Sequence, residues 1–159
     1  MKRREVEVVS SVDWLACDGE EVSQLCAILD ECATYPLGKG TLSIAFLGEG
    51  EICALHEKFL NDRTPTDVIT FCGDKEFGYA GEICASPTYA RQVCKEFGTT
   101  FREELTLYLV HGYLHLCGLD DIGKADRMEM RKAEKVCMNF LQLRRAIPNF
   151  VDKENFINL

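Results

Sequence analysis

Two histidines four residues apart are the candidate metal ligands of this sequence. His111 and His115 lie in a long apolar segment, and a helix there would place both imidazoles on one face, within reach of a single ion. Gly118 can adopt the left-handed conformation that ends a helix, and the chain can then turn back and bring Asp121 to the same ion. The spacing H-x-x-x-H-x-x-G-x-x-D therefore predicts a catalytic zinc site with three protein ligands and an open fourth position for water.

Histidine is scarce in this chain, which favours the metal interpretation. Only three histidines are present, and the pair uses two of them. An H-x-x-x-H pair also arises by chance in helices, where both rings are ordinary core or surface histidines. A metal site is favoured over that alternative because the helix is apolar and because the glycine and the carboxylate stand at the distances along the chain from the histidines that the geometry requires. Asp120 is expected to cap the turn after Gly118, and it stays a second candidate for the third ligand.

The residue that follows the first histidine restricts the chemistry. Zinc peptidases with this spacing place a glutamate there, where it acts as the general base. This chain has Gly112, which cannot accept a proton. Peptide hydrolysis by the usual route is therefore disfavoured, although a metal could still bind and activate water.

The elements that must position this segment alternate between strands and helices. The apolar patterns and turn residues predict strands from Val6 to near Asp13 and over 42–47, 68–72 and 81–85, and helices over 19–33, 52–61, 87–97, 105–117 and from 124 to a stop at Pro148. This order fits α+β or α/β, and we predict α+β, with a small mixed sheet of about four strands and about five helices. The helix that carries the histidines is apolar on almost every side, so we expect it to be central and buried.

The length and the C-terminal pattern predict one domain. A chain of 159 residues can bury a core without help from disulfides, and we expect residues 1–159 to form a single domain. The last helix is predicted to pack through one apolar face, made of Ala133, Val136, Cys137, Phe140 and Leu141. Residues 149–159 follow it as a tail that could be flexible.

Charge and cysteine usage exclude several classes of protein. The net charge of -8 argues against a protein that coats nucleic acid or anionic membrane by bulk charge, so an anionic substrate must meet a local basic site. The nine cysteines are odd in number, lie mostly among apolar neighbours and form no C-x-x-C, which is typical of reduced thiols. With no apolar stretch for a signal peptide or a membrane span, we expect a cytoplasmic protein.

Three motifs resemble one family. His111 to Asp121 resembles the H-G-x-L-H-L-x-G-Y-D-H signature of the YbeY family, metal-dependent endoribonucleases of bacterial rRNA maturation and ribosome quality control. Residues 65–71, Pro-Thr-Asp-Val-Ile-Thr-Phe, are similar to the family's P-T-D-V-L-S-F segment, and Gly81-Glu82-Ile83 stands where the family has G-D-I. The resemblance covers about residues 42–141, with the motifs in the family's order and spacing.

The resemblance implies an activity, a cofactor and partners. The expected activity is that of a metal-dependent endoribonuclease specific for single-stranded RNA, acting in rRNA processing and in ribosome maturation or quality control. One Zn²⁺ per chain would be held by His111, His115 and Asp121, and through it the two histidines would act in catalysis. With no evident general base in the signature, metal-activated water or the substrate's own 2′-hydroxyl would supply the nucleophile. The implied partners are single-stranded RNA, rRNA above all, and the ribosome or small-subunit ribosomal proteins, with no DNA or membrane partner.

The sequence departs from the family pattern at the end of the signature. The family has histidine where this chain has Asp121. Aspartate is a competent zinc ligand, but it lowers the net charge of the site by one, so a bound metal should acidify its water less. We therefore expect weaker or differently metal-selective activity than in relatives with three histidines.

A second departure lies upstream. The family carries a Tyr-Arg pair before P-T-D-V, with a catalytic role for the arginine, and this chain has Phe59-Leu60 at that place. Arg63 could reach the same cleft as a catalytic substitute and hold the scissile phosphate together with Lys58. The alternative for Arg63 is an exposed loop residue without such a role.

Two other classes of function remain open from the sequence. One is a zinc peptidase of unusual design, which the ligand spacing permits and Gly112 opposes. The other is a non-catalytic ribosome-assembly factor whose metal is structural. A site closed by four protein ligands would support the structural metal, and an open coordination position would oppose it.

Overall fold

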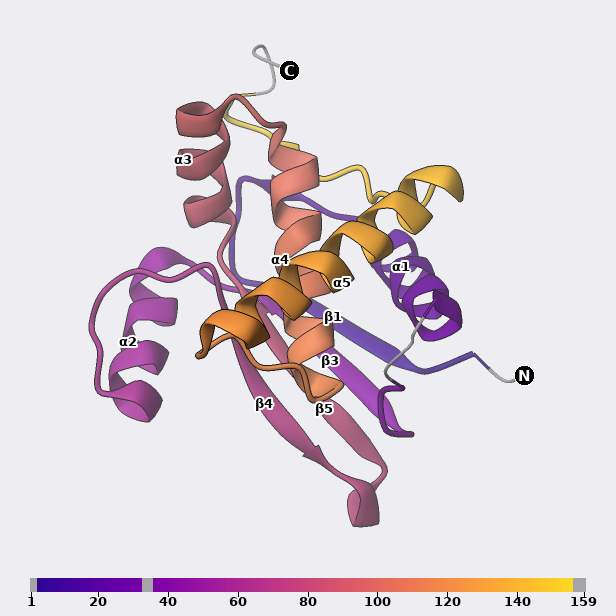
Figure 1. The fold of residues 1–159 in the computed structure, drawn as a ribbon. Helices are drawn as coiled ribbons and strands as arrows, with labels where there is room; N and C mark the ends of the chain where they lie inside the picture. The colour runs from indigo at the N-terminus through magenta and orange to yellow at the C-terminus, as the bar shows by residue number, and fades with distance from the viewer. Residues whose placement is uncertain (1–2, 33–35, 156–159) are drawn as a thin grey trace.

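The computed structural model describes residues 3–32 and 36–155 (Figure 1). The elements in chain order are β1 (Val6–Ser10), β2 (Leu15–Ala16), α1 (Gly19–Cys32), β3 (Thr41–Phe46), α2 (Glu49–Leu60), β4 (Val68–Asp74), the short 3-10 helix η1 (Lys75–Phe77), β5 (Tyr79–Ala85), α3 (Pro87–Phe97), α4 (Phe101–Leu116), α5 (Lys124–Leu143) and β6 (Val151–Asp152). The predicted strands and helices are all present, with ends displaced by a few residues. The predicted end of the first helix, at residue 33, lies outside the described residues.

The main sheet is mixed. Its strands lie in the order β1-β3-β5-β4, with β1, β3 and β5 parallel and β4 antiparallel to β5. The antiparallel pair is a hairpin closed by η1, and the parallel neighbours are joined by crossovers that contain helices, as parallel pairing requires. The prediction of an α+β fold with a four-stranded mixed sheet and five helices is confirmed.

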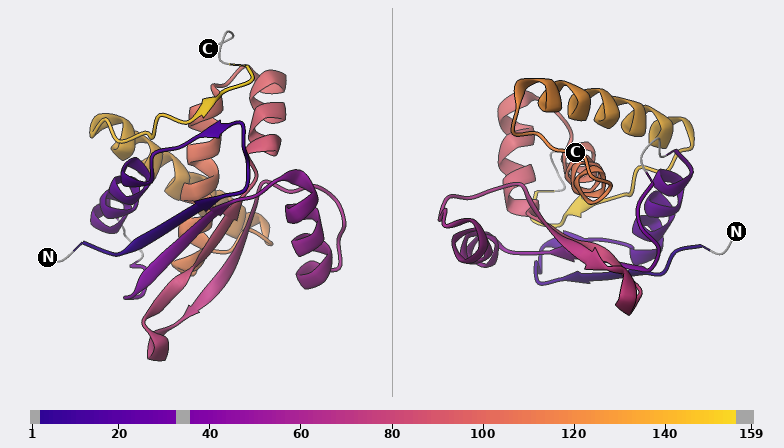
Figure 2. Two further views of the ribbon diagram at one scale, coloured as in Figure 1. Left: turned by 180° about the vertical axis from the view of Figure 1, so that it is seen from behind. Right: turned by 60° about the horizontal axis from the view of Figure 1, so that its bottom comes forward.

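Four helices, α1, α3, α4 and α5, pack in layers on one face of this sheet, and α2 covers the other. Side chains alternate between the faces of a strand, so Ile44 and Ile83 point into the main core with α4, whereas Ala45 and Cys84 point to the opposite face, where Ile52 of α2 covers them. In the right-hand view of Figure 2, α4 is seen nearly end-on between the sheet and α5. The prediction of a central buried helix is confirmed, since α4 buries nine of its residues.

The buried face of α5 differs from the predicted one. Val136, expected to pack, is 57% exposed. Cys137 and Leu141 are buried and Ala133 and Phe140 pack partly buried against the core, as predicted, but the buried set also includes Met130 and Glu134, so that the buried residues 130, 134, 137 and 141 follow spacings of four, three and four. The helix thus directs the carboxylate of Glu134 toward α4. The prediction for Val136 is wrong because the apolar residues of α5 occupy more of the helix surface than α4 covers, and Val136 lies outside the covered side.

Residues near the two ends of the described chain pair with each other. β6 lies antiparallel to β2 in a second, two-stranded sheet that the sequence pattern does not predict. Asp152 is buried and accepts two hydrogen bonds from Arg91, at 2.6 and 2.8 Å, and the Arg91 guanidinium stacks on Trp14 with 3.5 Å between Cζ and the ring centroid. Residues 149–155 of the predicted tail are therefore packed on the fold, and residues 156–159 lie outside the described part.

None of the helices in the described ranges is both long and apolar enough to cross a membrane.

The close approach of α4 to the sheet depends on Gly112. A Cβ at this position would lie 2.7 Å from Cγ2 of Ile83 on β5 and 3.2 Å from Cγ2 of Thr70 on β4. Contacts between carbon atoms are favourable at about 3.5 to 4.0 Å, so even one methyl group would overlap the sheet. The glycine therefore lets the helix lie directly on β4 and β5, and no larger side chain fits at this position.

Replacing this glycine should destabilise the fold. We expect Gly112→Ala to lower the free energy of unfolding by about 1 to 2 kcal/mol, because overpacking against the strand outweighs the roughly 1 kcal/mol gained from helix propensity. Gly50 on α2 is the matched control, since a Cβ there meets nothing within 4 Å. Gly50→Ala should leave stability unchanged or raise it by up to about 1 kcal/mol. Urea unfolding measures both, and a loss of equal size in the two variants would contradict the packing argument.

Candidate metal centre

Three side chains converge beside the C-terminal end of α4. His111, His115 and Asp121 each offer one ligand atom, and these atoms all lie within 4.8 Å of one another. Nε2 of His111 lies 3.0 Å from Nε2 of His115 and 3.3 Å from Oδ2 of Asp121, and the third separation, between His115 Nε2 and that Oδ2, is 3.6 Å. Tetrahedral zinc with bonds of 2.0–2.1 Å separates its ligand atoms by about 3.3 Å. The triangle therefore has the size that a metal ion requires.

Helix geometry supplies two of the three ligand atoms. His111 and His115 stand one turn apart on α4, with ring centroids 4.5 Å apart and planes at 84°. Their side chains are 14% and 25% exposed, so the rings are largely buried but not sealed from solvent.

The third ligand atom depends on how α4 ends. Gly118 has a φ of +105°. Its N–H donates to the carbonyl of His115, and the N–H of Leu119 donates to that of Leu114, which is the Schellman arrangement. The prediction for this glycine is confirmed, and the reversal returns the chain toward the histidines.

Asp120 and Asp121 have different tasks in the turn. The carboxylate of Asp120 accepts hydrogen bonds from the backbone N–H groups of Asp121 and Ile122, at 2.7 and 3.3 Å. Asp120 thus caps the turn, as predicted, and this leaves Asp121 as the carboxylate that faces both imidazoles.

Hydrogen bonds on the far side of each ring orient the nitrogen lone pairs. Nδ1 of His111 lies 2.6 Å from a carboxylate oxygen of Glu134, and Nδ1 of His115 lies 2.9 Å from the carbonyl oxygen of Leu119. Both partners are acceptors, so each Nδ1 carries the proton, and in the neutral rings each Nε2 presents a lone pair. Two lone pairs facing each other at 3.0 Å repel unless a cation lies between them. The donor set therefore fits a metal ion.

The contact between Glu134 and His111 shifts the pKa of both residues. Burial alone would lower the pKa of His111, but the hydrogen bond and charge of Glu134, together with the charges of Asp67 and Asp121, raise it above its ordinary value. Burial would raise the pKa of Glu134, and the hydrogen bonds from His111 and Arg131 outweigh it, so this pKa is lowered. Glu134 is therefore an ionised carboxylate in a buried place.

Glu134 and Arg131 are the residues of this site that the sequence reasoning misses. Glu134 is 4% exposed, and Nη1 of Arg131, three residues earlier on α5, lies 2.9 Å from its Oε2. A signal was present in the sequence: Met130, Glu134, Cys137 and Leu141 follow helical spacing, and a lone carboxylate inside an apolar stripe must find a partner.

Two predicted phosphate-binding residues lie elsewhere. Lys58 is on α2, across the sheet from α4, and its Nζ lies 5.2 Å from the Phe59 ring centroid. Arg63 follows α2 in a loop, where its side chain is 81% exposed and its Nε lies 3.3 Å from a carboxylate oxygen of Glu57. No described contact links either residue to the three candidate ligands.

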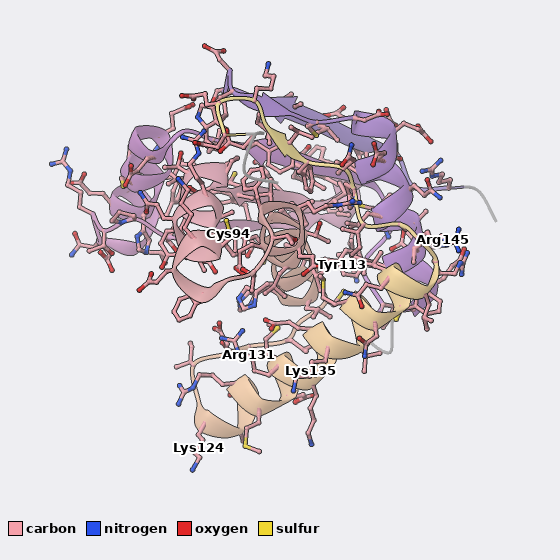
Figure 3. All side chains as sticks on the ribbon, turned by 90° about the horizontal axis from the view of Figure 1, so that it is seen from above. Cys94, Tyr113, Lys124, Arg131, Lys135 and Arg145 are labelled. Carbon is pink, nitrogen blue, oxygen red and sulfur yellow. The ribbon has the colours of Figure 1, made fainter. Side chains whose placement is uncertain are left out.

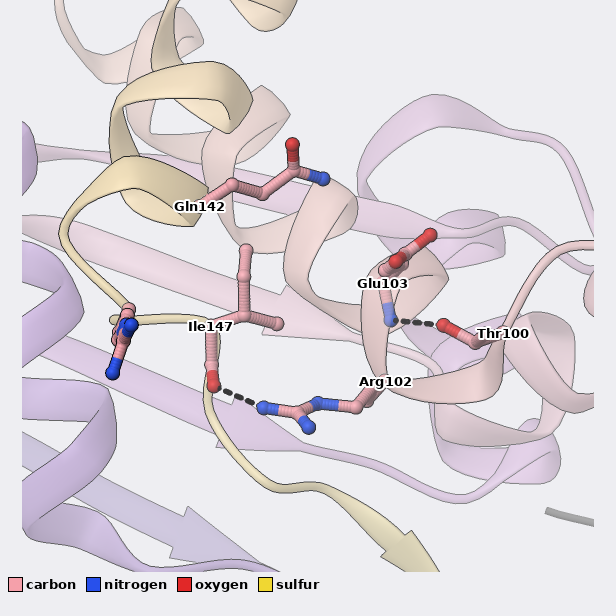
Figure 4. A pocket seen from close by; sticks show the side chains of 6 residues that line it. Thr100, Arg102, Glu103, Gln142 and Ile147 are labelled. Carbon is pink, nitrogen blue, oxygen red and sulfur yellow. Dashed lines mark hydrogen bonds between the residues drawn. The ribbon is translucent and has the colours of Figure 1, made fainter.

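A hollow of about 440 Å³ lies at the other end of α4 (Figure 4). It is lined by Thr100, Arg102, Glu103, Gln142, Arg145 and Ile147. Arg102 is engaged there, since its Nη2 donates to the carbonyl oxygen of Ile147 at 2.6 Å. The hollow begins where α4 begins, whereas the histidines lie near its end, so it is separate from the candidate metal centre.

Comparison with known proteins gives consistent matches. A family model described as "Endoribonuclease YbeY" matches residues 15–142. A protein named endoribonuclease YbeY from Protochlamydia amoebophila is 41% identical over 97 residues, which cover 58% of this chain and 65% of that protein, slightly under two thirds of its length. A protein of the same name from Porphyromonas gingivalis is 31% identical over 115 residues, covering 72% of this chain and 76% of its own length.

One solved structure shares the fold. A solution structure of a Thermotoga maritima protein superposes with a TM-score of 0.58 at 23% sequence identity, covering 89% of this chain and 94% of that one. At this level of identity the likeness concerns the arrangement of the elements alone.

Neighbouring aspartates give a matched test of the ligand set. We expect Asp121→Ala to lower the affinity for Zn²⁺ at least about tenfold, because it removes one of three ligand atoms, and Asp120→Ala to change that affinity much less, because its carboxylate caps backbone N–H groups. Competition with a chromogenic chelator measures the affinity, and circular dichroism shows that both variants are folded. Equal zinc affinity in wild type and Asp121→Ala would remove Asp121 from the ligand set.

Proposed function

This chain belongs to the YbeY endoribonuclease family, and on that basis we propose that it cleaves single-stranded RNA, rRNA above all, in a metal-dependent reaction that serves ribosome maturation or quality control. The observation that carries the proposal is the triangle of ligand atoms from His111, His115 and Asp121, which lies within the segment matched by the family.

The metal in this proposal is one Zn²⁺ per chain. Two imidazoles and one carboxylate are ligands that zinc accepts, and the separations of their atoms suit its bond lengths. When bound there, the ion would activate water and polarise a phosphodiester oxygen. Glu134 and the Leu119 carbonyl hold the two imidazoles in the orientation that the ion needs.

The carboxylates that contact the histidines are already engaged. Glu134 accepts hydrogen bonds from His111 and Arg131 and is buried, so it is poorly placed to take a proton from an attacking group. Asp121 faces the two Nε2 atoms. The nucleophile therefore comes from solvent or from the 2′-hydroxyl of the RNA, and a cyclic 2′,3′-phosphate on the product would identify the second route.

Neither of the other two functions has comparable support. A peptidase with a glutamate after the first histidine is incompatible with this packing, because position 112 has no room even for a Cβ. A purely structural metal would be expected in a site closed by four protein ligands, whereas the group in the described part of the chain contains three residues. An open position is what a hydrolytic site requires.

The proposed location and partners follow from charge and thiol chemistry. All nine cysteines are unpaired, as expected in the cytoplasm. A chain with a net charge of -8 would meet rRNA, the ribosome or small-subunit ribosomal proteins through a local surface rather than through bulk attraction. Lys58, on the helix that covers the opposite face of the sheet, and Arg63, in the loop that follows this helix, would contact RNA phosphates.

RNA cleavage with and without metal is the first test. We expect purified wild-type protein to cut single-stranded RNA, a chelator to stop the reaction, added Zn²⁺ to restore it, and His115→Ala to lower the rate at least about a hundredfold. Structured RNA should resist cleavage. Equal cleavage in every sample, His115→Ala included, would indicate a contaminant and leave the proposal without support.

Arg63 should affect RNA cleavage without affecting the fold. We expect Arg63→Ala to slow cleavage about fivefold through weaker substrate binding and to leave the melting temperature unchanged, because the side chain is exposed and pairs with Glu57 at the surface. Arg144→Ala is the matched control, since Arg144 is also an exposed arginine paired with a glutamate, Glu31. A wild-type rate in Arg63→Ala would remove Arg63 from the substrate contacts.

A further inference from the structure

We propose that Arg131 binds a phosphate of the RNA backbone on the α5 side of the candidate metal centre, next to Glu134. This assignment rests on the proposed function and adds to it the cation that meets the substrate at the centre. The ligand class is a phosphodiester of single-stranded RNA.

Contacts connect Arg131 to the candidate ligands through one residue. Its Nη1 lies 2.9 Å from Oε2 and 3.3 Å from Oε1 of Glu134, and Oε1 lies 2.6 Å from Nδ1 of His111. Figure 3 shows Arg131 on the side of α5 that faces α4, whereas Lys124 points away from the rest of the molecule at the start of α5. The carboxylate of Glu134 thus links Arg131 to the imidazole of His111, one of the candidate metal ligands.

Most of the hydrogen-bonding capacity of Arg131 is unused. The guanidinium carries five N–H donors, and its described contacts all run from Nη1 to Glu134. Within the described residues it has no other partner, and its side chain is 69% exposed. Nε and Nη2 can therefore donate to a phosphate while Nη1 stays on Glu134, which also fixes the direction of the planar group.

The charges of the centre require such a cation. A divalent ion would be neutralised by the two carboxylates that contact the histidines, Asp121 and Glu134, and Asp67, whose charge also acts on His111, adds a further negative charge. Such a centre in a protein with a net charge of -8 would not attract an anionic backbone. Arg131 offsets one of these negative charges, on the side where its guanidinium is open to solvent.

Other nearby cations are less suited to this role. Nη1 of Arg127 donates to the carbonyl oxygen of Ile122 at 2.6 Å, in the turn before α5, and no described contact connects Arg127 to Glu134 or to the histidines. Lys58 belongs to α2, which covers the opposite face of the sheet, and Arg63 lies in the following loop, where it pairs with Glu57. Lys132 is exposed beside Arg131 in sequence, and in the described part of the chain no contact connects it to Glu134 or to the histidines. It therefore serves as a control of equal charge.

The test measures RNA binding instead of turnover. Wild type, Arg131→Ala, Arg131→Lys and Lys132→Ala are saturated with Zn²⁺ and titrated with a fluorescent 2′-O-methyl RNA strand at several salt concentrations, and the strand is checked for integrity afterwards. Loss of one phosphate contact lowers the slope of log affinity against log salt by about 0.7 for a single strand. We expect that change and about fivefold weaker binding for Arg131→Ala, and wild-type behaviour for Lys132→Ala. Arg131→Lys should keep the slope, because the charge remains, with intermediate affinity.

Zinc affinity, measured separately, distinguishes substrate binding from a structural role. If Arg131 only held Glu134 in place, Arg131→Ala would weaken zinc binding but keep the wild-type salt slope at saturating zinc, and the proposal would be wrong. It would also be wrong if Arg131→Ala and Lys132→Ala lost equal slope, because the effect would then be one of overall charge. Failure of the wild type to bind or cleave RNA would instead overturn the proposed function itself, so the two failures are distinguishable.

Discussion

The contact between α4 and the sheet at Gly112 is the constraint on which the rest of the structure depends. Because α4 lies directly on Ile83 and Thr70, its last two turns carry His111 and His115 to the boundary between core and solvent. α5 can then cross above α4 and place Glu134 beside His111. The same contact removes the side chain that a peptidase would use as its base. Packing and chemistry are therefore linked at one position: the helix approaches the sheet closely only with a residue that cannot act on a proton.

The candidate metal centre has positive charge beside its ligands, although the net charge of the protein is negative. Its ligands are partly buried, one imidazole is held by an ionised buried carboxylate, and this carboxylate is itself held by an exposed arginine. With Asp121 in place of a neutral third ligand, the net charge of the site is lower by one. The placement of single charges near the histidines therefore matters more than the net charge of the molecule. An acidic protein can in this way present a small cationic surface to RNA without attracting nucleic acid along its whole surface.

Local patterns predicted most of the fold and part of the site. The H-x-x-x-H pair, the reversal at Gly118 and the cap at Asp120 all depend on residues a few positions apart, so helical spacing and turn chemistry were sufficient. Glu134 was missed because the prediction for α5 considered apolar residues alone and included Val136, and only the packed structure shows which side α4 covers. For Arg63, the described contact reaches Glu57 and not the histidines, so its role at the scissile phosphate stays a prediction. The pairing of two-residue strands from distant parts of the chain leaves no local pattern at all.

That pairing has a consequence for how the molecule forms. β2 lies near the start of the described chain and β6 near its end, and the hydrogen bonds from Arg91 to Asp152 close the same region. Contacts so distant along the chain impose a large loss of chain entropy before they contribute any stabilisation, which slows folding. During translation the sheet and the two histidines of α4 can assemble while this closure is still incomplete. Because this closure involves none of the three candidate ligands, variation in β2 or β6 should alter the stability of the folded state more than the geometry of the candidate metal centre.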